Sequence, residues 1–228
     1  MKRNNARPEG RRVAVGFALL MLLASSPLLR STDALAATTA AGVDTSGPAE
    51  MIRSASDVML KDLDANRAAY RKDRTKLYEL VDRVLLPNFD VNFAAQQVLG
   101  KYWRAASEQQ RDRFVKAFYR SLLQTYGDAM LEFTGDRIRF LPYQGDPTAT
   151  RATVRSEVRR DGGSSVKVNY SLRKTESGWK AFDVVIEGIS YVKSFQEDFA
   201  SELEQKGLES LTQRLETGAA AARSAPRT

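Results

Sequence analysis

The sequence predicts an α+β domain in which helices cover one face of a curved antiparallel sheet of about four strands. Three observations favour this class. Apolar residues recur at helical spacing up to about residue 133, they alternate with polar residues from about 138 to 188, and helical spacing returns after Tyr191. Because the alternating strands have only one apolar face, the helices are the elements that must cover it.

Several helices are expected in the first half. Apolar residues form two stripes over 51–63 and 77–85, and Pro87 ends the second helix because proline disfavours helical backbone in the residue before it. A short helix is expected over 93–102. Ser107 and Gln110 have the spacing of a capping box, which predicts that another helix starts at this point and runs to about 133.

Four strands follow, at about 137–141, 152–158, 166–172 and 179–186. The turn residues at 161–163 and 176–178 are short connections, which require antiparallel pairing of consecutive strands. Small residues point inward from strand 152–158, and they leave either a void or a space that a neighbouring Phe fills. A last helical segment follows over 191–203, where Gly207 is expected as its C-cap before a short helix over 208–215.

The N-terminus has the organisation of a secretory signal peptide. Five Lys or Arg residues precede the short apolar run "VAVGFALLMLLA", and the A-x-A sequence at 34–36 offers a cleavage site. An uncleaved membrane anchor is the alternative. We therefore expect a signal peptide over 1–36, a flexible leader over 37–48, one domain over 49–217 and a flexible tail over 218–228.

Composition excludes several function classes. The 228 residues include no His and no Cys, so the chain has no thiol nucleophile, no Ser-His pair and no zinc site of the usual type. We expect no catalytic residue, no metal site and no cofactor. The net charge of +7 falls to about +3 without residues 1–36. The sequence has no concentrated basic patch with interleaved aromatics, so nucleic-acid binding is not expected.

Motifs over almost the whole mature chain resemble those of the MlaC family, also called the toluene-tolerance auxiliary component. The motifs are "LGKYWR" with "EQQ", and "GWKAFDV" with "EGIS". The resemblance implies an NTF2-like cone with an apolar cavity for the acyl tails of a glycerophospholipid. It also implies a periplasmic carrier that shuttles lipid between an outer-membrane lipoprotein complex and an inner-membrane ABC transporter complex with an MCE-domain subunit, and so maintains outer-membrane lipid asymmetry.

For this cavity we expect inward-facing residues of the strands and of the capped helix to contact the lipid tails, with ordinary core packing as the alternative. Two other functions stay open: an isomerase-type enzyme on the same cone, which needs an inward carboxylate, and an adaptor without a ligand. Tyr102 and Trp103 line the mouth or wedge helices together, and Asp183 is expected to pair with Lys180 or Lys174. The expected lipid-binding residues are Phe118, Leu122, Val154, Val158, Val168, Tyr170, Leu172, Phe182, Val184 and Ile186.

Overall fold

The computed structural model describes residues 42–132, 134, 137–146, 148–160 and 163–218. The expected signal peptide and nearly all of the expected tail lie outside these residues. Val43, within the expected leader, is fully buried, and the first described helix begins at Pro48. The packed structure therefore starts a few residues before the predicted boundary at 49.

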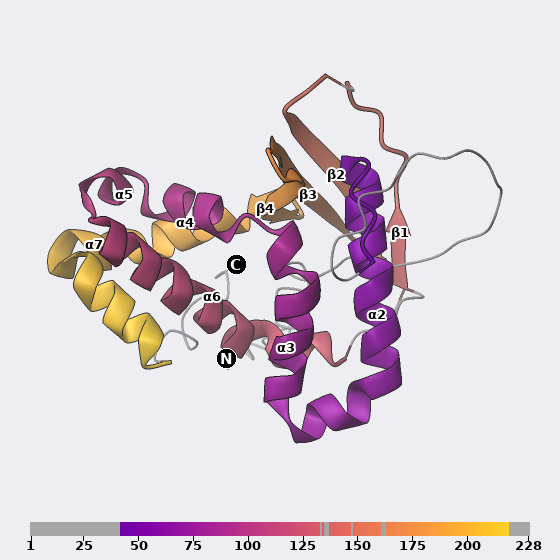
Figure 1. Cartoon of the computed structure of the whole chain (residues 1–228), viewed down its shortest axis with the longest axis horizontal. Coiled ribbons are helices and arrows are strands. Elements are labelled where there is room, and N and C mark those ends of the chain that lie inside the picture. The colour runs from indigo at the N-terminus through magenta and orange to yellow at the C-terminus, as the bar shows by residue number, and fades with distance from the viewer. Residues whose placement is uncertain (1–41, 133, 135–136, 147, 161–162, 219–228) are drawn as a thin grey trace, which may run out of the picture.

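The described residues form helices on both sides of a sheet-forming segment in the chain, as the periodicity predicts (Figure 1). The helices are α2 (Pro48–Lys72), α3 (Arg74–Val84), the short 3-10 helix η1 (Leu86–Asn88), α4 (Val91–Leu99), α5 (Lys101–Ala105), α6 (Glu108–Met130) and α7 (Tyr191–Glu216). The strands are β1 (Ile138–Phe140), β2 (Arg151–Arg159), β3 (Ser165–Thr175), β4 (Gly178–Ile186) and β5 (Ile189–Ser190).

The expected helix boundaries follow from local hydrogen bonds. The capping box is present: the Gln110 backbone N–H donates to Ser107 Oγ at 3.2 Å, and the Ser107 N–H donates to Gln110 Oε1 at 2.9 Å. Asp73 separates α2 from α3, because its side chain accepts from the Thr75 N–H. Gly207 has φ 76° and kinks α7 at the point where the sequence predicts one helix to end and another to begin.

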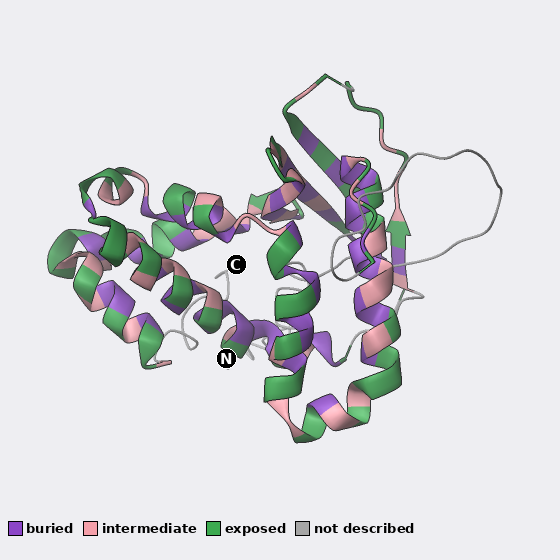
Figure 2. Cartoon of the chain, viewed as in Figure 1, coloured by how far each residue is buried: buried purple, intermediate pink, exposed green. Residues whose placement is uncertain are grey.

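The strands form one antiparallel meander in the order β1-β2-β3-β4-β5, with one strand more than expected. Buried and exposed residues alternate along β2 and β3 (Figure 2). Helix α2 contacts β2 and β4, and α7 contacts α4, α6 and β4, so helices cover the apolar face of the sheet. This arrangement confirms the predicted α+β class.

A β-bulge in β4 breaks the alternation. Ser171 of β3 pairs with Asp183, but Leu172 pairs with Ala181, so Phe182 is an extra residue between them. As a result Ala181 and Val184 both face the core, and Phe182 turns to the other face, where its ring meets Phe93 edge-on at 5.0 Å. The prediction that Phe182 shares a face with Val184 and Ile186 was wrong, because strict alternation assumes a strand without an inserted residue.

Candidate functional site

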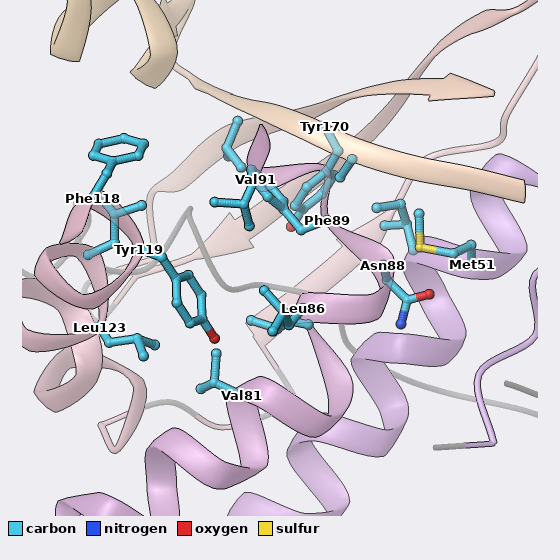
Figure 3. Close-up of a pocket in the computed structure, with 15 residues that line it drawn as sticks. Met51, Val81, Leu86, Asn88, Phe89, Val91, Phe118, Tyr119, Leu123 and Tyr170 are labelled. Carbon is cyan, nitrogen blue, oxygen red and sulfur yellow. The ribbon is translucent and has the colours of Figure 1, made fainter. Parts of the chain in front are cut away.

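An apolar pocket lies between the helices and the inner face of the sheet (Figure 3). The part wide enough to admit the centre of a water molecule is about 60 Å³, and the space free of protein atoms, including the part open to solvent, is about 740 Å³. None of the described residues that line the pocket carries a charge. The lining residues are Met51, Ile52, Val81, Leu85, Leu86, Asn88, Phe89, Val91, Phe118, Tyr119, Leu122, Leu123, Tyr170, Ala181 and Val184.

The local sequence explains how the wall at η1 is built. Pro87 ends α3 and starts the 3-10 turn, and this brings Leu86 and Phe89 to the pocket. The chain then runs beside β4, where the Asp90 N–H donates to the Ala181 carbonyl at 2.7 Å. The Asn88 side-chain amide donates to the Val84 carbonyl at 2.7 Å, so this polar side chain is satisfied by backbone.

Helices α3 and α6 form the rim of the pocket. The two helices touch at Gly127, where an added Cβ would lie 3.1 Å from the ring of Tyr78. Nearer the pocket, the Tyr119 hydroxyl of α6 donates a hydrogen bond to the carboxylate of Asp82 on α3. Burial, and then the bond to Asp82, raise the pKa of Tyr119, so the hydroxyl keeps its proton at neutral pH. Leu86 lies at the same rim and is 41% exposed.

The sheet contributes Tyr170, Ala181 and Val184 to the pocket wall. Tyr170 is only 2% exposed, and its hydroxyl has no hydrogen-bond partner among the described residues. The buried Ser156 hydroxyl on β2 donates to the Val168 carbonyl at 3.2 Å. Burial raises the pKa of Tyr170, and the neighbouring Ser156 hydroxyl opposes the rise, so the Tyr170 side chain is a neutral donor within an apolar wall.

Part of the predicted lipid-binding set lines this pocket, namely Phe118, Leu122, Tyr170 and Val184. A second group faces the same side of the sheet but is packed in the core and does not line the pocket. For these residues the structure agrees with the alternative stated above, ordinary core packing. That group is Val154, Val158, Val168, Leu172 and Ile186. Phe182 lines a different groove on the opposite face.

Sequence reasoning missed the wall made by α2, α3 and η1. Met51 and Ile52 were assigned to a helical stripe, and Leu85 and Leu86 were considered only as the end of a helix before Pro87. One signal was available: three apolar residues, Leu85, Leu86 and Phe89, surround a proline that keeps the chain from continuing as a helix. Burying apolar side chains of such a turn against another apolar surface is favourable, so this pattern indicates a contact with the core.

The groove on the opposite face has a volume of about 470 Å³ and is lined largely by polar residues, with Trp103 and Arg104 among them. Trp103 does not line the apolar pocket. Its carbonyl accepts from Arg111 Nε at 2.8 Å, and the Arg111 guanidinium lies 5.4 Å from its ring centroid, which fits the role of holding α5 against α6.

Asp183 lines the same groove on the opposite face. Its carboxylate does not pair with Lys180 or Lys174, the partners that the sequence had led us to expect. Its carboxylate accepts from the Ser190 hydroxyl at 2.7 Å and from the Val192 N–H at 3.0 Å. Burial raises the pKa of Asp183, and these hydrogen bonds oppose the rise. Asp183 therefore stabilises the start of α7, where free backbone donors need an acceptor.

Two kinds of feature are absent from the described ranges. No helix in them is long and apolar enough to cross a membrane. They also contain no group of three or more acidic residues arranged to hold a metal ion. The apolar pocket has the concave, mainly apolar lining that is typical of ligand sites.

The fold and the pocket define an α+β binding protein with an apolar site between helices and sheet. The family model described as "MlaC protein" matches residues 53–217, and the chain belongs to the MlaC family. It is 32% identical over 190 residues to the toluene tolerance protein ttg2D of Pseudomonas putida, covering 83% of this chain and 82% of that protein.

Two further relatives extend the comparison. The intermembrane phospholipid transport system binding protein MlaC of Haemophilus influenzae is 26% identical over 176 residues, covering 75% of this chain and 82% of that protein. A solved structure of a phospholipid-binding protein from Ralstonia solanacearum, in complex with a phospholipid, matches with a TM-score of 0.68 and 25% identity. The match covers 75% of this chain and 97% of the Ralstonia chain.

Proposed function

We propose that this protein is a non-enzymatic carrier that binds glycerophospholipid, with acyl tails in the apolar pocket and the headgroup at the rim between α3 and α6. The observation that carries the proposal is the uncharged pocket wall, which opens beside the exposed side chain of Leu86. The relatives named for phospholipid binding and transport, one of them solved with a phospholipid, support the same ligand class.

The energetics favour a carrier for such a ligand. Removing one methylene from water contributes about 0.8 kcal/mol, so hiding roughly 25 methylenes contributes about 20 kcal/mol. Unaided diffusion of a diacyl lipid through water is therefore negligible. Because methylenes are alike, a chain shorter by one changes the binding free energy by only about 1 kcal/mol, and we expect weak discrimination of chain length.

Binding requires the pocket to widen. Ligand pockets usually enclose about 300–1,000 Å³, and the enclosed space here is about 60 Å³. The wall that must move is the one between α3 and α6, since the opposite wall is a hydrogen-bonded sheet. Breaking the Tyr119–Asp82 bond and separating these helices gives the tails a route in and out.

We further propose that the carrier works in the periplasm after removal of residues 1–36. The basic and apolar segments of this N-terminus support export. Its proposed partners are an outer-membrane lipoprotein complex and an inner-membrane ABC transporter complex with an MCE-domain subunit, and its role is to maintain outer-membrane lipid asymmetry. A passive carrier has no energy source, so these complexes must drive release.

An isomerase-type enzyme is the less supported alternative. Such an enzyme needs a carboxylate base next to a donor such as Tyr170. The described lining residues offer the tyrosine but no Asp or Glu, and Asp183 lies on the opposite face of the sheet. An adaptor without a ligand predicts instead that the pocket stays empty.

Native mass spectrometry of the mature chain, purified from a bacterial periplasm, tests the proposal. We expect an added mass of phospholipid at about one molecule per chain, which disappears on delipidation and returns on incubation with phosphatidylethanolamine vesicles. A protein that carries no lipid and does not load from vesicles would overturn the proposal in favour of the adaptor.

A further inference from the structure

Among the described residues of the sheet wall, Tyr170 is the polar one, and its hydroxyl makes no hydrogen bond of normal geometry, since the neighbouring Ser156 hydroxyl donates to the Val168 carbonyl. In this respect Tyr170 differs from Asn88, whose side-chain amide donates a hydrogen bond to the Val84 carbonyl. In Figure 3 the Tyr170 ring lies beside Phe89 and Val91, among the side chains that enclose the pocket. A buried hydroxyl without a hydrogen bond is costly, so a ligand that supplies an acceptor gains relative to one that does not.

The chemistry of the acceptor follows from the surroundings. Tyr170 is a neutral donor, so its partner must be an acceptor oxygen. None of the described lining residues is a cation, and a buried carboxylate without a counter-charge is strongly disfavoured. An uncharged carbonyl satisfies both conditions, and the carbonyl of a lipid ester is the group of this kind that a diacyl lipid brings.

We propose that Tyr170 is a specificity-determining residue, whose hydroxyl donates a hydrogen bond to an ester carbonyl of the bound lipid. This inference rests on the proposed lipid-carrier function. It adds a preference that an apolar wall alone cannot give: ester-linked lipids are selected over ether-linked lipids of the same length, and over free fatty acids, whose acceptor is charged.

The test uses the delipidated mature chain and equimolar vesicles of diacyl and dialkyl phosphatidylethanolamine with equal chain lengths. Native mass spectrometry reports the ratio of bound ester to bound ether lipid. We expect a ratio of about three to ten for the unaltered protein, because one net hydrogen bond contributes a factor of this size. In Tyr170→Phe the ratio falls to about one, because the ring is kept and only the hydroxyl that distinguishes the two lipids is lost.

Tyr126→Phe is the matched control. Tyr126 is also buried, 4% exposed, and its hydroxyl is also without a partner among the described residues, but it does not line the pocket. The ratio of bound ester to bound ether lipid in Tyr126→Phe should equal that of the unaltered protein. From a third vesicle that contains free fatty acid, the unaltered protein should take up less fatty acid than it takes up ester lipid.

The outcomes separate this inference from the proposed function. If the unaltered protein loads both lipids equally, or if Tyr170→Phe keeps the ester preference, the inference fails and the carrier proposal stands. If neither lipid loads, both fail. A measurement that needs no variant is the infrared band of an isotope-labelled ester carbonyl: a hydrogen bond shifts it to lower frequency in the complex, and an unshifted band overturns the inference.

Discussion

The two sides of α6 are packed in different ways. Toward α7 the space is filled by rings: Phe114 stacks on Phe118 at 5.7 Å, and Phe118 meets Phe195 and Phe199 edge-on at 5.2 and 6.1 Å. Toward α3 the side chains leave a pocket, whose rim is joined by the Tyr119–Asp82 bond. One helix thus belongs to an aromatic core on one side and to the wall of a pocket on the other.

The difference shows how a small domain can hold a pocket and stay folded. Aromatic pairs add about 0.5–1.5 kcal/mol each beyond the area they bury, so the α6–α7 side fixes the position of α6. Arg113 also binds Glu209 and Glu216 of α7, but these side chains are largely exposed and contribute little. Because α7 holds α6, the proposed opening on the side toward α3 would leave the aromatic core in place.

The largest expected effect is on the filled side. Phe114 is fully buried, and Phe114→Ala should lower the free energy of unfolding by about 3–5 kcal/mol, because it removes a ring and leaves a void among other rings. Leu123→Ala, on the pocket side, should cost about 2 kcal/mol, since its neighbours already border empty space. Denaturant unfolding of both variants gives the comparison, and a larger cost at Leu123 would contradict it.

A smaller effect on stability, with a large effect on binding, is expected from filling the pocket. Ala181 lines it, and Ala181→Phe should remove most of the bound phospholipid at a stability cost of about 1–3 kcal/mol. Ala152 is a matched control, because it faces the same side of the sheet, is 9% exposed and does not line the pocket. Ala152→Phe should cost similar stability and keep the lipid, as native mass spectrometry would show.

The same comparison explains what could be predicted from the sequence. Helical and alternating periodicity fixed the element types, and the capping box located the start of α6 to the residue. Period alone did not locate the bulge, because Phe182, Val184 and Ile186 are spaced as in a strand without an inserted residue, and so Phe182 was assigned to the wrong face.

The pocket itself was only partly predictable. Alternation along a strand shows which side chains face inward, because this is a local property. For this reason Tyr170 and Val184 were among the predicted inward-facing residues that line the pocket. Which inward residues touch a void depends on how helices distant in sequence pack, and aromatic rings from α7 fill the space on one side only. The walls from α2, α3 and η1 follow from that tertiary packing.

The next prediction concerns the rim. Tyr119→Phe keeps the ring and removes the bond to Asp82, so it should lower stability by only about 1 kcal/mol and speed lipid transfer to acceptor vesicles by about two- to tenfold. Asp82→Ala should give the same acceleration, and the double variant should add little to it. Tyr102→Phe, outside the pocket, is the control, and additive effects at the two positions would show that they act separately.

The smallest effect on stability is expected at Leu86. Among the described residues, Leu86 and Ile189 are the two large apolar side chains that are exposed, by 41% and 40%. Replacing either with Ser should change the free energy of unfolding by less than about 1 kcal/mol, because both side chains lie at the surface with about two fifths of their area exposed.

Loading from vesicles separates the two positions. Leu86 lies at the rim, where a tail leaving the vesicle meets the protein first, so Leu86→Ser should slow loading by about two- to fivefold through lost apolar contact. Ile189 in β5 does not line the pocket, and Ile189→Ser should load at the rate of the unaltered protein. Equal slowing in both variants would mean that tails enter by another route than the rim between α3 and α6.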